Sequence, residues 1–511
     1  MLGSTPGELT NTSTGTYYGG NTIIVSNNSF HNYGLFSIGQ LKTISQSNLT
    51  GRFYQHEGGR LAISIDSLKA IKNDYLQVNG NAIVGGSIRP LARSLLPGAI
   101  PFLTATNLVS TASVLDAHLF DWNLTAAGNR LIMTPTANFS PTGYDLTPNQ
   151  RSLANYLSRG WMSSDRALGQ IFGYLHEIPL GDHLNYQNIL NQLSGQVLNS
   201  QAVQMKTNFA NSLAYSMSCP LLHGQNGDMK QTDCSWGFVS GNLTDQSSNA
   251  SNAGYQSIAG AVRFGAQKAF DHDWTTGFAV GYGTNKLTSA GFSSTGNVVD
   301  VAVSASKAIS QWSFGTSLAY AQGWFNNSRT PQLFGLGAAD SLATTYGSKS
   351  GLYGLGWRVR SAYEVPLSAY YIKPYVDLDL IYTKQPGYSE TSGILGLKAG
   401  ASDQINFVAT PMVEIGSNWL IAGNISLRGY LSAGASFLPN NKIATQMTFM
   451  NAMGSNGSFN IVTNGPNAFG IAKAGLQAFE TDKFEIRAEY GVQAGQGYLS
   501  QSLGANLIYR F

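Results

Sequence analysis

The sequence has few charged residues and no long apolar run. Charged residues are 11% of its 511 residues, whereas about 25% is usual in soluble domains. Few charges are typical of membrane proteins, yet no apolar stretch reaches the roughly 18 residues that a transmembrane helix needs. The other structure that can span a bilayer is a closed β-barrel, in which apolar and polar residues alternate and the mean hydropathy stays near zero. The mean hydropathy of −0.08 fits such a barrel.

Several kinds of chemistry lack their usual residues. The net charge of +3 is too small to indicate a nucleic-acid partner. The seven histidines are scattered through the chain, and neither a His-Glu-x-x-His nor a Gly-x-Ser-x-Gly motif occurs. The histidines are His31, His56, His118, His176, His183, His223 and His272. We therefore expect no enzyme activity, no metal site and no cofactor.

Apolar and polar residues alternate with a period of two in many segments of the C-terminal half. The last segment places Leu503, Ala505, Leu507, Tyr509 and Phe511 on one face, and this pattern marks a strand with one apolar side. Comparable segments recur back to about residue 236 and number about twelve, as in outer-membrane barrels. We predict a mainly β chain with a twelve-stranded antiparallel transmembrane β-barrel over residues 235–511. A soluble all-β sandwich is the alternative.

The connections between these segments favour the barrel. Short turns are predicted near residues 271–273, 310–311, 366–368, 416–418 and 480–482. They alternate with connections near 246–253, 286–296, 325–350, 384–403 and 438–466, most of which are longer. Outer-membrane barrels alternate short periplasmic turns with long extracellular loops in this way, whereas a sandwich does not require it.

Two sets of side chains have positions that suit a barrel in a membrane. Aromatic residues next to the short connections are candidates for a girdle at the membrane interface. They are Trp236, Trp274, Trp312, Tyr370, Trp419 and Phe484. Charged residues of the opposite parity are candidates for a hydrated, paired lining of the lumen. They are Arg263, Asp300, Arg358, Arg360, Asp377, Asp379, Glu414, Arg428, Glu485, Arg487 and Glu489.

Between residues 147 and 218 the period changes to that of helices. Thr147 and Pro148 suit an N-cap and a first helical position, and a second helix is predicted over 163–177. A third, over about 185–217, has Ile189 and Leu193 on one face and mostly small or polar residues elsewhere. It would be about 45 Å long, enough to cross a membrane inside a hydrated barrel lumen. An amphipathic periplasmic helix is the alternative.

Cys219 and Cys234, the only cysteines, lie between this helical region and the first predicted strand. An even number of cysteines in an exported chain predicts a disulfide. Closing so short a loop would contribute about 3 kcal/mol to stability. We treat residues 219–234 as a disulfide loop.

Three stretches of the sequence resemble the type V secretion (autotransporter) family. They are Cys219-Pro220 followed by Cys234-Ser235-Trp236, residues 371–379 (Tyr-Ile-Lys-Pro-Tyr-Val-Asp-Leu-Asp) and residues 386–390 (Pro-Gly-Tyr-Ser-Glu). The resemblance extends over about residues 60–511. It implies a barrel that inserts in the outer membrane, a helix that occupies its pore, and an N-terminal passenger that is exported, anchored and exposed on the cell surface.

The resemblance also implies partners and one difference from the family. Chain ends such as Tyr509 and Phe511 resemble the signal recognised by the outer-membrane barrel-assembly machinery. The expected partners are this machinery, outer-membrane lipid and the chain's own passenger, with the protein a monomer. Some members cleave themselves at an Asn-Asn pair in the pore helix. This chain has Asn199-Ser200 instead, so no such cleavage is expected. The alternatives are a substrate-conducting or ion-selective porin and a surface adhesin whose stem or loops bind a host or cell surface.

Residues 1–146 are rich in Gly, Asn, Ser and Thr and contain short β-prone runs at 22–25, 34–38 and 59–65. Their spacing predicts rungs of a parallel β-helix, here the end of a passenger stem. Residues 75–86 resemble the stretch of the family that assists passenger folding. An irregular β-sandwich is the alternative. The first residues have no signal peptide, which export requires, so we expect the sequence to be part of a longer protein.

Overall fold

The computed structural model describes residues 8–217, 219, 233–250, 252–270, 273–333, 335, 342–422, 425–480 and 483–511. The chain divides into two compact units. The first consists of residues 1–146, 150–190 and 451–459. The second consists of residues 147–149, 191–450 and 460–511.

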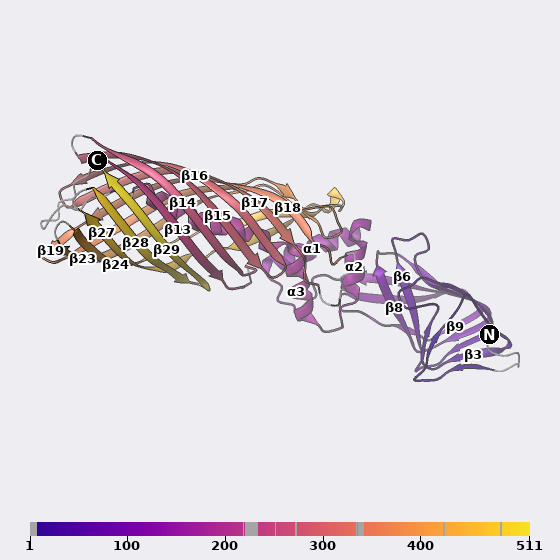
Figure 1. Cartoon of the computed structure of the whole chain (residues 1–511). Coiled ribbons are helices and arrows are strands. Elements are labelled where there is room, and N and C mark those ends of the chain that lie inside the picture. Colours follow the sequence, from indigo (N-terminus) through magenta and orange to yellow (C-terminus); the bar gives the residue numbers. More distant parts are fainter. Residues whose placement is uncertain are drawn as a thin grey trace. The chain divides into compact units, whose positions relative to one another are not determined.

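The N-terminal part of the first unit is a solenoid of two sheets (Figure 1). One sheet has the order β1-β3-β5-β7-β9-β12-β11 and the other the order β10-β8-β6-β4-β2. Neighbouring strands from β1 to β10 are parallel, whereas β12 pairs antiparallel with β9 and β11. The strands are β1 (Leu9–Asn11), β2 (Thr16–Tyr18), β3 (Thr22–Asn32), β4 (Leu35–Ser37), β5 (Gln46–Gln55), β6 (Arg60–Asp66), β7 (Tyr75–Val84), β8 (Ser87–Ser94), β9 (Ile100–Ser110), β10 (Ser113–Val114), β11 (Phe120–Ala127) and β12 (Arg130–Ala137). The predicted parallel β-helix is confirmed, and the alternative of a β-sandwich is wrong.

The solenoid core is built from side chains that return at the same position on successive turns. Phe30 on β3 lies directly beside Phe53 on β5, with ring centroids 5.6 Å apart. Phe36 on the facing sheet lies 5.0 Å from Phe30 and 5.8 Å from Phe53. All three rings are fully buried. Because each turn can bury its apolar face only against its neighbours, this stacking is what holds the solenoid together.

A buried carboxylate joins two parts of this solenoid. Asp74 accepts a hydrogen bond from the backbone N–H of Ser45 at 2.6 Å and another from that of Ser64 at 2.7 Å. Its side chain is fully buried. Burial raises the pKa of Asp74 to about 6, although both hydrogen bonds oppose the change. The ionised form is therefore costly in the folded stem at neutral pH.

We expect the stem to lose stability as the pH rises from about 4 through about 6. The folded-state pKa of Asp74 lies above its unfolded value, so the contribution is complete below the unfolded pKa and is lost above the folded one. The loss is roughly 3 kcal/mol. Urea unfolding of the full chain, followed by the fluorescence of Trp122 and Trp161, measures it. Asp74→Asn should remove this pH dependence, and an unchanged slope in that variant would contradict the assignment.

Helices follow the solenoid. They are α1 (Pro148–Met162), the short 3-10 helix η1 (Arg166–Leu168), α2 (Gly169–His176), α3 (His183–Ser194), a second 3-10 helix η2 (Gln196–Asn199) and α4 (Ser200–Tyr215). Among the described residues, no helix is both long enough and apolar enough to cross a membrane.

The third predicted helix is interrupted, which corrects the expectation of one continuous helix over residues 185–217. Gly195 separates α3 from η2 and has a φ of 66°, a left-handed conformation that glycine adopts at little cost. The second predicted helix is also shorter than expected, because residues 163–165 form a turn in which Asp165 caps η1 through the N–H of Ala167. The helix that continues toward the barrel is therefore α4, of 16 residues.

The second unit is dominated by a closed antiparallel barrel (Figure 1). The described residues form twelve barrel strands in sequence order, closed by the pairing of β29 with β13. They are β13 (Cys234–Gln246), β14 (Tyr255–Phe270), β15 (Trp274–Ser289), β16 (Phe292–Ile309), β17 (Trp312–Arg329), β18 (Tyr346–Tyr363), β20 (Tyr370–Gln385), β23 (Ser402–Ala422), β24 (Ile425–Phe437), β27 (Ala468–Glu480), β28 (Phe484–Gly495) and β29 (Tyr498–Arg510). A short strand, β19 (Val365–Leu367), pairs with the start of β20. The predicted barrel is confirmed.

Three predicted connections differ from the structure. Pro366 and Leu367 of the predicted turn 366–368 belong to β19, and the turn is formed by residues 368–369. Residues 416–418 lie inside β23, which ends at Ala422, and β24 begins at Ile425. Gly416 is required there because a Cβ atom would lie 2.3 Å from the ring of Tyr371. The predicted long connection at 286–296 is a tight hairpin in which Ser289 pairs with Phe292. Of the other short turns, residues 271–272 and 481–482 lie outside the described residues.

Two long connections of the barrel carry further strands. These are β21 (Tyr388–Ser389) and β22 (Leu397–Ala399) between β20 and β23, and β25 (Lys442–Phe449) and β26 (Phe459–Asn464) between β24 and β27. They form one four-stranded sheet in the order β21-β22-β25-β26. We call this sheet the collar. It lies at the barrel end opposite the short turns, because β20 and β24 both run from a short turn toward it.

Candidate functional site: the barrel lumen and its helix

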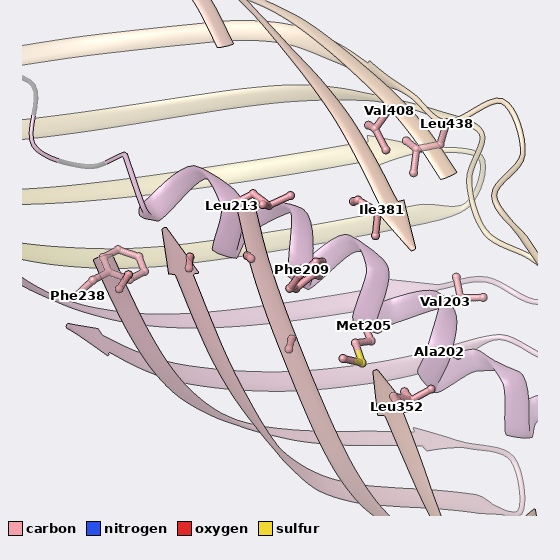
Figure 2. Packing of buried hydrophobic residues seen from close by; sticks show 14 of the residues in the cluster. Ala202, Val203, Met205, Phe209, Leu213, Phe238, Leu352, Ile381, Val408 and Leu438 are labelled. Atoms are coloured by element: carbon pink, nitrogen blue, oxygen red, sulfur yellow. The ribbon is translucent and has the colours of Figure 1, made fainter. Parts of the chain in front are cut away.

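α4 lies inside the barrel, surrounded by inward-facing side chains of the strands (Figure 2). Met205, Phe209 and Leu213 recur on one side of the helix and are nearly fully buried. They belong to a cluster with apolar residues of many barrel strands, among them Ile381 and Val408. The prediction of a helix in the pore holds for α4, and the periplasmic alternative is wrong for it.

Small residues on the barrel wall make room for the helix. A Cβ atom on Gly356 of β18 would lie 2.6 Å from Phe209 Cε1 and 2.9 Å from Leu213 Cδ1. Ala319 and Ala321 of β17 are buried in the same cluster. The helix therefore packs directly against the backbone of the wall, and larger wall residues would exclude it.

Polar contacts hold the C-terminal end of the helix. Ser317 Oγ donates to the carbonyl of Leu213 at 3.1 Å, and Ser304 Oγ donates to the carbonyl of Ser216 at 2.7 Å. Arg263 donates to Ser212 Oγ at 2.8 Å and pairs with Asp300 at 3.1 Å. The two serines of the wall bind carbonyls of the last turn, where backbone acceptors lack N–H partners within the helix, so the wall recognises the C-terminal end of α4.

The predicted charged residues all lie on inward-facing positions, and each of them takes part in an ion pair. Asp377 lies 2.6 Å from Arg360 and 3.3 Å from Arg358, which also pairs with Asp379 at 2.6 Å. Further pairs are Arg428 with Glu414 at 3.5 Å, Lys373 with Glu414 at 2.8 Å, Arg487 with Glu485 at 2.8 Å, Lys473 with Glu489 at 3.0 Å, and Arg510 with Glu485. Lys373, Lys473 and Arg510 were not among the predicted lining residues, although their parity in the sequence matches.

The helix divides the free space of the lumen into separate cavities. Two cavities lined by described residues flank it, with volumes of about 90 and 80 Å³, and a third of about 210 Å³ lies beside the C-terminal end of α4. The first lies toward β13–β17 and the second toward β18–β28. Each has room for a small group of water molecules. The arrangement is that of a plugged barrel and does not favour the porin alternative.

Five of the six candidate girdle residues point outward near the rim with the short turns. Trp274, Trp312, Tyr370, Trp419 and Phe484 are between 45% and 62% exposed. The sixth, Trp236, is wrongly assigned, because it is 5% exposed and belongs to the cluster inside the barrel. It fits there because its partner on β14 is Gly265, where a Cβ atom would lie 2.4 Å from the indole. Tyr509 and Phe511 also point outward, at 41% and 70% exposure.

We call η2 and α4, with the chain that follows them to Cys219, the pore segment. The disulfide joins the end of this pore segment to the first barrel strand. Cys219 is bonded to Cys234, the first residue of β13. The carbonyl of Cys219 accepts a hydrogen bond from Gln267 of β14 at 3.2 Å. Residues 220–232 of the predicted loop lie outside the described residues. Because Cys234 pairs with Arg510 of β29, this end of the pore segment lies at the same rim as the chain end.

The other end of the pore segment is held by the collar. The side chain of Asn199 accepts from Thr445 Oγ1 at 3.0 Å and donates to the carbonyl of Ile461 at 3.4 Å. The collar also binds Asn149 at the start of α1. The side chain of Asn149 donates to the carbonyl of Val462 and accepts from the N–H of Val462, both at 2.8 Å. The side-chain amide of Asn149 thus makes the two hydrogen bonds, one donated and one accepted, that the backbone of a neighbouring strand would make with Val462. These contacts were not predicted, because the residues are more than 240 positions apart in the sequence.

The interpretation of the histidines as scattered is wrong for the solenoid. His31 Nδ1 and His56 Nε2 lie 3.0 Å apart, and Ser29 Oγ lies 2.8 Å from His31 Nε2. The 25-residue separation of the two histidines matches one turn of the solenoid, a signal that the sequence contained. Within the described residues, no group of three His, Cys, Asp or Glu side chains is arranged to hold a metal ion.

A model of the autotransporter β-domain family matches residues 235–491. Similar solved structures include the translocator domain of the autotransporter NalP from Neisseria meningitidis, at 13% identity, covering 62% of this chain and 99% of that one, with a TM-score of 0.48. They also include the β domain of the Bordetella autotransporter BrkA, at 14% identity, covering 55% of this chain and 100% of that one, with a TM-score of 0.41. A third is the transport unit of the autotransporter AIDA-I from Escherichia coli, at 15% identity, covering 59% of this chain and 97% of that one, with a TM-score of 0.39. No curated protein matches the chain.

Proposed function

The chain belongs to the autotransporter family, and we propose that after export it keeps its passenger attached, as an anchor without catalytic activity. As a member of this family it is an outer-membrane translocator unit that exports an N-terminal passenger to the cell surface. The observation that supports the proposed anchoring is the course of residues 195–234. Of these, the described residues 195–217 run from the collar along α4 through the lumen, and Cys219 is bonded to Cys234 at the opposite rim.

The absence of cleavage is proposed from the surroundings of Asn199. Its side-chain amide is fully buried and occupied by Thr445 and Ile461. The following residue is serine and not a second asparagine. A side chain held in this way is not free to attack the adjacent backbone carbonyl, so the passenger is expected to stay continuous with the barrel.

The proposal also includes two partners, outer-membrane lipid and the barrel-assembly machinery, and a monomeric state. The outward faces of the strands are apolar, with residues such as Leu431, Leu503 and Ile486 more than half exposed, which suits contact with outer-membrane lipid. The exposed Tyr509 and Phe511 are available to the barrel-assembly machinery. We expect a monomer, because one chain closes the barrel by itself.

Protease treatment of intact cells tests the anchoring. The chain is expressed behind a signal peptide with an epitope tag at residue 1. Before treatment, the tag and the barrel should migrate as one polypeptide. Treatment should remove the tag and leave a membrane-protected fragment that starts near residues 180–199, before α4 enters the lumen. A tag that is accessible only after the outer membrane is opened would contradict export, and two separate polypeptides before treatment would contradict the absence of cleavage.

A further inference from the structure

One buried cation in the lumen has no acidic partner. Lys206, on the side of α4 facing β23, is 2% exposed. Its Nζ donates to Gln404 Oε1 at 3.0 Å and to Asn406 Oδ1 at 3.4 Å. Among the described residues, no carboxylate lies within 4.0 Å of it, whereas other charges of the lumen are paired. A buried charge without a counter-charge is costly.

The two amides next to Lys206 are held in one orientation. Gln404 Nε2 and Asn406 Nδ2 both donate to the carbonyl of Asn440, the second at 2.7 Å. Because their N–H groups are occupied there, their oxygens face Lys206. An ammonium group has three donors, and these oxygens accept two of them. The wall therefore presents only acceptors to Lys206, and the charged form of the lysine has one donor left for another acceptor.

The 80 Å³ cavity beside α4 provides the space for that acceptor. Lys206 and Asn406 line it together with Arg358, Arg360, Asp377 and Lys473. Arg358 is neutralised by Asp379, Arg360 by Asp377 and Lys473 by Glu489. The positive charge left over among these groups is that of Lys206, and the cavity has room for more than one water molecule.

We propose that Lys206, with its cavity between α4 and the barrel wall, binds one small monovalent inorganic anion such as chloride. The bound anion supplies the missing counter-charge and accepts the third N–H of the ammonium group. Its binding would stabilise the plugged barrel, because the cavity wall is completed by α4 and is lost when the helix leaves. This inference does not depend on whether the passenger is cleaved.

Chloride-35 NMR of the full chain, refolded in detergent, tests the site. Wild-type protein should broaden the chloride line, and bromide should reverse the broadening whereas the bulky gluconate ion should not. Lys206→Met should lose the excess line width. Lys206→Arg should keep it, and Lys349→Met, which removes an exposed lysine of β18, should also keep it. A second measurement uses only wild-type protein: crystals grown in sodium bromide should show an anomalous peak next to Lys206 Nζ.

Two outcomes would overturn the proposal. One is a chloride line width in wild-type protein no greater than that of empty micelles, which would mean that Lys206 is held as a neutral amine. The other is equal broadening in wild type and Lys206→Met while both keep the heat-dependent gel shift of a folded barrel. If Lys206→Met does not fold, the bromide peak decides: its presence supports the site and its absence rejects it.

Discussion

Replacing Gly356 by valine is expected to open the lumen to ions. The new Cβ would lie 2.6 Å from Phe209 Cε1 and 2.9 Å from Leu213 Cδ1. β18 cannot move away, because Gly356 is paired with Ala319 of β17 on one side and with Ile381 of β20 on the other. Overpacking of this kind costs about 1–3 kcal/mol. Since the helix is held by packing at this point, we expect it to leave its position.

The measurement is ion conductance in planar lipid bilayers. Wild-type protein should conduct little, and Gly356→Val should show frequent openings of several times the wild-type conductance. Gly351→Val is the matched control, because Gly351 lies on the same strand and a Cβ there has no neighbour closer than 3.9 Å. The control should conduct like the wild type. Equal conductance of both variants would show that α4 is not held against Gly356.

Removing one charge from the lumen wall should be more damaging than removing a pair. Asp377 is 4% exposed and is the carboxylate that neutralises Arg360, at 2.6 Å. Asp377→Asn leaves that guanidinium, whose side chain is 29% exposed, without its counter-charge, whereas Arg358 keeps Asp379. Breaking a fully buried pair costs about 3–5 kcal/mol. Because Arg360 is partly exposed, we expect the free energy of unfolding to fall by about 3 kcal/mol or less.

The double variant Arg360→Met/Asp377→Leu is the control for this prediction. It removes both charges and keeps similar volumes, and replacing a buried pair by apolar residues is often close to neutral. Guanidinium unfolding, followed by loss of the heat-dependent gel shift, should place the double variant near the wild type and the single variant well below it. Equal losses in both variants would mean that packing and not charge controls stability at this site.

Much of the barrel could be predicted because its pattern is local. Lipid on one side and a hydrated lumen on the other force alternate residues to differ, and Arg358 and Asp379 were placed on the inward face from parity alone. Their pairing follows from the direct register of β18 and β20. Trp236 shows where parity fails: the room for its ring comes from Gly265, which a single strand's sequence does not reveal.

Other features depended on residues far apart in the chain. The collar joins two long connections, and its contact with Asn199 spans more than 240 residues, so no local pattern indicated it. The break at Gly195 was readable, because glycine in a helix is a common stop signal, but the helical periodicity on both sides concealed it. Lys206 was missed because a single lysine among polar residues is usually solvated, and only the barrel around it makes it exceptional.

The collar has a consequence for protein engineering. The contacts that hold the pore segment at the collar are those of Asn199 with Thr445 and with the backbone of Ile461 in β26. Residues 1–146, 150–190 and 451–459 belong to the other compact unit. The barrel, α4 and most of the collar therefore form a transplantable module: an unrelated domain fused ahead of residue 191 would inherit the attachment at Asn199 and the same closed lumen. The passenger itself does not contribute to the contacts of Asn199 with the collar, so the attachment does not depend on which passenger is carried.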